Sequence, residues 1–162
     1  MNDRELFIQR RRAEHPIFQR VLKALPKDKL DYKPHERSPS AAQILTTMAH
    51  EQAACARLVA TGRTEWAPPP PGTYDEMVEA FEREWKALDE GVAGLDDAGW
   101  DKVGEFMSKG KAYPGQPIGQ FLWFILFDAV HHRGQLTTYI RPMGGRVPAV
   151  YGPSADERPP AG

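Results

Sequence analysis

The chain has 162 residues, a single cysteine and a formal net charge of −1, so it can bury a hydrophobic core without disulfides. This charge balance argues against nucleic acid as a partner, and the longest apolar run, Phe121 to Phe127, is far shorter than the roughly 20 residues of a membrane span. Because no signal-peptide pattern opens the chain and a lone cysteine suits a reducing compartment, we expect a cytoplasmic protein with no membrane partner.

The first predicted helix runs from about Asp3 to Leu25. Pro16 lies inside it and must either kink the helix or begin a new one. The helix stops before Pro26, and a loop follows over residues 26–39. The apolar side of this first helix is formed by Phe7, Ile17, Phe18, Val21, Leu22 and Leu25.

The second predicted helix starts at Ser38 or Ser40 and ends at Thr61. Ser40 followed by Gln43 three residues later is a capping-box pattern, which satisfies backbone donors at a helix N-terminus. Gly62 comes next and suits the left-handed position that ends many helices.

The third predicted helix follows four consecutive prolines at 68–71, which we expect to form a stiff extended linker. Thr73 and Glu76 form a second capping box at its start, and the helix ends near Gly91 or Gly94. Its apolar residues recur every three or four positions, as a helix packed on one side requires: Met77, Phe81, Trp85, Leu88 and Val92.

An irregular connection over residues 94–116 is predicted to pack against the helices and to line a site. The fourth predicted helix opens at Pro117 and ends before Pro142. It is apolar on more than one side, which indicates a central helix with several neighbours.

The chain as a whole predicts an all-α fold, because period-two alternation is nearly absent. We expect a four-helix bundle with long connections, in either an up-and-down or a crossover topology. The bundle is predicted to occupy residues 1–146, and residues 147–162 to form an extended C-terminal tail whose last residues are disordered.

Asp128 and His132 are the first candidates for chemistry, because residues four apart on a helix point the same way. A carboxylate and an imidazole at this spacing can offer two ligands to one metal ion. The spacing alone leaves a simpler reading open, in which the two side chains hydrogen-bond each other or a neighbour.

His50, on the second helix, is the candidate for a third ligand. It points nearly opposite the apolar face of that helix, with Thr47 and Ala54 as small neighbours. Small neighbours can line a cleft, but they also suit an exposed face. Cys55 lies on the apolar face, which favours buried packing over a role as a catalytic thiol.

Three stretches of the chain resemble the DinB family of metalloenzymes. The first is Leu-Asp-Tyr-Lys-Pro-His-Glu-Arg-Ser at 30–38, which leads into the helix that carries His50. The second is Asp-Ala-Val-His-His-Arg-Gly-Gln-Leu at 128–136, similar to the family signature His-x-x-x-His-Arg-Gly-Gln. The third is Tyr-Ile-Arg-Pro-Met-Gly at 139–144 and the residues that follow it.

The resemblance implies a four-helix bundle, usually dimeric, that holds a divalent metal through His50, Asp128 and His132. Asp128 departs from the family pattern, where histidine is commonest, although a carboxylate is also a competent ligand. Zinc, nickel, iron or manganese would all suit such a site, and three protein ligands leave coordination positions open, as in catalytic centres.

The resemblance further implies a thiol-dependent S-transferase or a hydrolase, with a small-molecule substrate and a low-molecular-weight thiol as partners. The alternative is a non-catalytic, stress-associated homodimer that binds metal for stability or sensing. The same ligands would serve both, so the residues leave this choice open.

Overall fold

The computed structural model describes residues 1–158, and the described part of the chain contains five helices and four short strands. The prediction that the last residues are disordered concerns 159–162, which lie outside the described residues. The elements in chain order are α1 (Asp3–Lys23), α2 (Ala41–Thr61), β1 (Arg63–Trp66), α3 (Tyr74–Ala93), α4 (Asp97–Asp101), β2 (Val103–Ser108), β3 (Lys111–Ala112), β4 (Gln116–Pro117) and α5 (Ile118–Ile140).

The ends of the long helices follow the predicted capping residues. The capping boxes of Ser40 with Gln43 and of Thr73 with Glu76 are both formed, and Gly62 ends α2 in the left-handed conformation at φ 77°. Helix α1 continues through Pro16 as a single helix. Local hydrogen bonding at the termini therefore determines where these helices begin and end.

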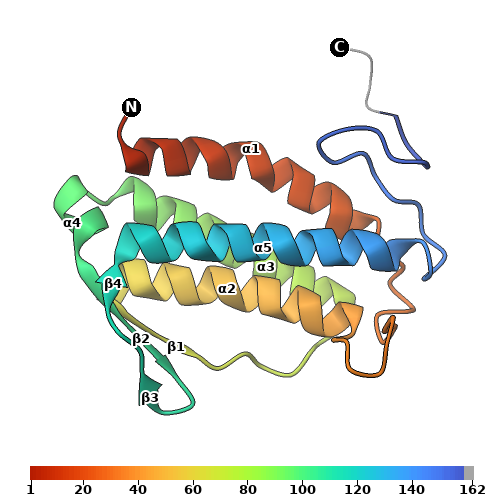
Figure 1. Cartoon of the computed structure of the whole chain (residues 1–162), viewed down its shortest axis with the longest axis horizontal. Coiled ribbons are helices and arrows are strands. Elements are labelled where there is room, and N and C mark those ends of the chain that lie inside the picture. The colour runs from red at the N-terminus through yellow and green to blue at the C-terminus, as the bar shows by residue number, and fades with distance from the viewer. Residues whose placement is uncertain (159–162) are drawn as a thin grey trace.

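The all-α prediction is wrong, because a four-stranded mixed sheet is present at one end of the helices (Figure 1). Strand β1 pairs in parallel with β2, in a register that places Arg63 opposite Glu105, and β2 also pairs antiparallel with both β3 and β4. The predicted irregular connection over 94–116 thus contains α4, β2 and β3. Strands of two to six residues are too short for a detectable alternating pattern, and the β1–β2 pairing depends on contacts far apart in sequence.

The four long helices lie side by side around one hydrophobic core (Figure 1). Helix α2 packs against α3 and α5, and α1 packs against the same two helices from the other side. Among the described residues, no helix combines the length and the apolar character that a membrane crossing demands. The face shared by α2 and α5 is the one that carries the candidate site.

The C-terminal segment folds back onto α1 and α5. Glu157 pairs with Arg20 of α1 at 2.9 Å, and Asp156 pairs with Arg141 at 2.9 Å. The hydroxyl of Tyr151 donates to Glu14 of α1 at 2.7 Å. These contacts hold the segment after α5 against α1 and against the C-terminal end of α5.

Candidate metal centre

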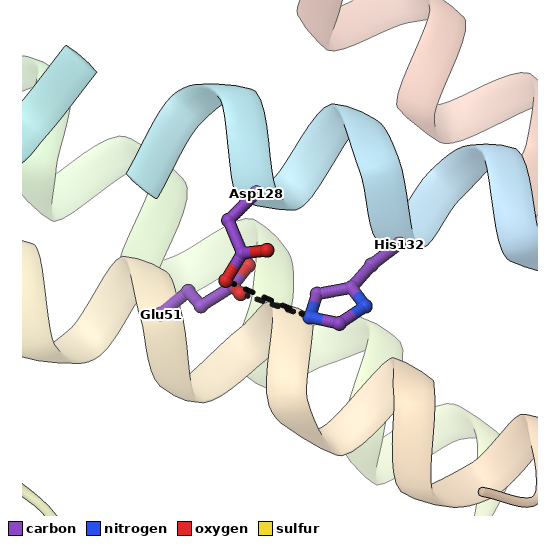
Figure 2. Close-up of side chains that lie close together, drawn as sticks. All are labelled: Glu51, Asp128 and His132. Atoms are coloured by element: carbon purple, nitrogen blue, oxygen red, sulfur yellow. Dashed lines mark ion pairs between the residues drawn. The ribbon is translucent and has the colours of Figure 1, made fainter. Parts of the chain in front are cut away.

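Three side chains from α2 and α5 converge between the two helices (Figure 2). They are Glu51 of α2 and Asp128 and His132 of α5, and one ligand atom from each lies within 4.8 Å of the others. His132 Nε2 is 3.3 Å from Glu51 Oε1 and 3.8 Å from Asp128 Oδ2. One imidazole and two carboxylates form a reasonable ligand set for a divalent metal ion.

Helical spacing accounts for the position of each group. Glu51 follows Met48 by three residues and precedes Cys55 by four, so it lies on the buried face of α2. Asp128 and His132 are one turn apart on α5 and both point toward α2. The side-chain exposure rises from 0% for Glu51 through 19% for His132 to 39% for Asp128, so the group is open to solvent on the Asp128 side.

The carboxylate of Glu51 is buried and incompletely satisfied. Neither of its oxygens has a hydrogen-bond partner, and Oε1 lies at ion-pair distance, 3.3 Å, from Nε2 of His132. Burial raises the pKa of Glu51 to about 7, although the neighbouring His132 opposes this shift. A buried carboxylate without hydrogen bonds is costly, and a bound cation would reduce that cost, so the residues fit a metal ion.

His132 is oriented for coordination by Gln135. Its Nδ1 lies 2.9 Å from Gln135 Oε1, and because an amide oxygen only accepts, Nδ1 carries the hydrogen and donates it. Nε2 is then left facing the two carboxylates, as in metal sites where a second partner fixes the histidine tautomer. Burial opposes the charge on His132, but contacts with Glu51, Gln135 and Asp128 outweigh it and raise the pKa of His132 to about 9.

The structure brings together two of the three residues singled out from the sequence, Asp128 and His132, whereas His50 has other partners. His50 Nε2 accepts a hydrogen bond from the backbone N–H of Ala67 at 3.1 Å, and its ring packs edge-on against Trp66, with centroids 4.8 Å apart. These contacts fasten the start of the proline-rich linker to α2. In the described residues the candidate group contains Glu51 in its place.

Sequence reasoning missed Glu51, although one signal was available. Glu51 is a charged residue on the apolar face of α2, where a lone carboxylate needs a compensating partner. Cys55, one turn further along the same face, is buried as expected, and burial raises the pKa of its thiol. The raised pKa leaves it a poor nucleophile.

We expect the melting temperature of the metal-free protein to fall as the pH rises from about 5 to 9. The folded-state pKa of Glu51 is raised from 4.5 to about 7, and that of His132 from 6.5 to about 9, so folding takes up protons in this range. The stability that His132 contributes is complete below pH 6.5 and disappears as the pH passes 9, while the cost of ionised Glu51 grows between pH 4.5 and 7. A bound metal requires the deprotonated ligands, so metal should stabilise the fold more at higher pH.

Calorimetry at several pH values, with excess chelator or excess Mn²⁺ or Zn²⁺, measures both trends. The Glu51→Gln variant serves as the control, because it should lose the part of the pH slope that arises from this group. A stabilisation by metal that stays constant from pH 5 to 9 would contradict the assignment.

The chain is similar in sequence to a protein family and to a protein of Bacillus subtilis. Residues 1–160 match the model of the DinB family. A stretch of 41 residues is 44% identical to the uncharacterized protein YrdA of Bacillus subtilis (strain 168), and this match spans 25% of each chain.

Solved structures show the same fold. A DinB-like protein from Bacillus cereus ATCC 10987 superposes with a TM-score of 0.73 at 22% identity, covering 91% of this chain and 97% of that one. A DinB-like protein from Bacillus subtilis, YjoA, gives 0.68 at 15% identity, covering 86% and 92%. The mycothiol-dependent maleylpyruvate isomerase gives 0.60 at 12% identity, and this chain covers 61% of its length while 88% of this chain is matched. Because the family match extends over nearly the whole sequence, the protein is a member of the DinB family.

Proposed function

We propose that this protein is a metal-dependent enzyme that acts on a small molecule together with a low-molecular-weight thiol, as a transferase or a hydrolase. In this proposal Glu51, Asp128 and His132 hold the metal. The observation that carries it is the buried Glu51 carboxylate, which has no hydrogen-bond partner and faces Nε2 of His132.

The donor set suits a catalytic centre better than a purely structural one. Three protein donors leave coordination positions for other ligands, and the partial exposure of Asp128 puts those positions on the solvent side. A divalent ion held there would lower the pKa of a thiol or a water molecule. Gln135 keeps His132 in the tautomer that presents Nε2, and buried Glu51 would supply a negative charge once a metal ion displaces its proton. The thiol dependence of the structurally similar maleylpyruvate isomerase supports a thiol as co-substrate.

The test begins with metal analysis of the purified protein and continues with turnover assays. The metal-loaded protein is incubated with small thiols, such as cysteine and glutathione, and with an electrophile such as 1-chloro-2,4-dinitrobenzene or an activated ester. We expect turnover that depends on metal and is lost with chelator and in His132→Ala. His131→Ala is the matched control, since His131 is exposed on the same helix and should leave both properties intact. Unchanged metal content in His132→Ala would refute the site.

The second candidate is a non-catalytic homodimer with a stress-associated role, in which metal only stabilises the fold. Two exposed aromatic side chains on α5 favour self-association, Phe124 at 61% exposure and Phe127 at 65%. Analytical ultracentrifugation of the wild type and of a Phe124→Ser, Phe127→Ser variant tests the dimer. Metal-dependent melting without turnover on any thiol and electrophile pair would favour this second candidate.

A further inference from the structure

The candidate centre contains more oxygen donors than nitrogen donors. Two of its three side chains, Glu51 and Asp128, are carboxylates, and only His132 offers an imidazole nitrogen. Carboxylates favour hard divalent ions such as manganese(II), whereas imidazoles favour zinc, copper, iron and nickel. Resting on the proposed function, we propose that this centre is tuned toward a hard ion, with manganese(II) as its resident metal.

Charge supports the same assignment. With both carboxylates ionised the donor set carries two negative charges, which neutralise a divalent ion. The nearest arginine in sequence, Arg133, is turned away and pairs with Glu14 at 2.6 Å, so it does not offset these charges. The centre therefore offers two negative charges and mainly oxygen donors. In such a centre the binding affinity of a weakly polarisable ion falls little below that of a softer ion.

Access favours an ion with a high coordination number. Asp128 is 39% exposed, so water molecules can complete the coordination on that side. Manganese(II) commonly takes six ligands, and the three side chains would supply at least half of them, whereas a structural zinc site is usually closed by four protein ligands.

The test is a change of donor type at one ligand. Mn²⁺ binding is followed by the loss of the free-ion electron paramagnetic resonance signal, and Ni²⁺ binding by calorimetry, in the wild type and in Asp128→His. We expect Asp128→His to weaken Mn²⁺ binding by about tenfold or more and to strengthen Ni²⁺ binding, so that the ratio of the two dissociation constants shifts by up to ~100-fold. Asp101→His is the control, because it adds a histidine at an exposed position outside the group.

Asp128→Asn provides a second measurement should the histidine variant fold poorly. It removes one charge while keeping the side-chain shape, and we expect it to weaken Mn²⁺ binding more than Ni²⁺ binding. An unchanged affinity ratio in both variants, or a wild-type protein that binds Ni²⁺ but not Mn²⁺, would overturn the tuning while leaving a metal site in place. A wild-type protein that binds neither ion nor Zn²⁺ would instead refute the proposed function.

Discussion

Replacing Glu51 with glutamine is expected to lower metal affinity by at least about 100-fold while leaving the metal-free protein at least as stable as the wild type. Glutamine keeps the shape of the side chain but removes the charge that a cation requires. The wild-type carboxylate is fully buried and its oxygens lack hydrogen-bond partners, so its ionised form is costly without metal. Isothermal titration with Mn²⁺ and Zn²⁺ measures the affinity, and urea unfolding in the presence of chelator measures the stability.

His50→Gln is the matched control for this experiment, since the two residues are adjacent on α2. His50 is hydrogen-bonded to Ala67 and packed against Trp66, so its replacement should loosen the linker and leave metal binding intact. The opposite pattern, with metal binding lost in His50→Gln and retained in Glu51→Gln, would restore the ligand set that the family resemblance implies.

Replacing Arg133 with methionine is expected to destabilise the fold by about 3–5 kcal/mol. Arg133 is 2% exposed, donates to Glu14 at 2.6 Å, and stacks over Phe18 with its guanidinium carbon 4.5 Å from the ring centroid. Without it, Glu14 is left as a buried carboxylate whose remaining partner is the hydroxyl of Tyr151 at 2.7 Å. Removing one partner of a buried pair leaves an uncompensated charge, which costs more than the pair itself contributes.

A double-mutant cycle separates this effect from simple loss of packing. Combining Arg133→Met with Glu14→Gln should recover much of the lost stability, because the amide has no charge to compensate. Tyr151→Phe, which removes only a hydroxyl, should cost about 1 kcal/mol. Urea unfolding of the wild type, of the single variants Arg133→Met, Glu14→Gln and Tyr151→Phe, and of the double variant provides these values. An Arg133→Met variant within about 1 kcal/mol of the wild type would contradict the account.

The long helices could be predicted because their signals are local. Ser40 with Gln43, Thr73 with Glu76, and Gly62 act on backbone groups within one turn of themselves, so the sequence nearby contains the information. The sheet could not be predicted in this way. Strand β1 has four residues and pairs in parallel with β2 about forty positions later, and its stability depends on that distant partner.

The candidate site was only partly predictable for a related reason. Asp128 and His132 belong to one helix, where spacing alone places them together. The third group depends on how α2 is rotated against α5, and adjacent residues on a helix point about 100° apart. The helical wheel points His50 away from the apolar face of α2, which agrees with its contacts to Trp66 and Ala67. The same rotation directs Glu51 toward α5.

The most direct test of the central claim is anomalous diffraction from crystals of the protein loaded with Mn²⁺ or Zn²⁺, recorded at the absorption edge of the metal. The account predicts one strong anomalous peak between α2 and α5, about 2.0–2.3 Å from Nε2 of His132 and from a carboxylate oxygen of both Glu51 and Asp128. A peak coordinated by His50, or a loaded crystal with no peak between these helices, would contradict it.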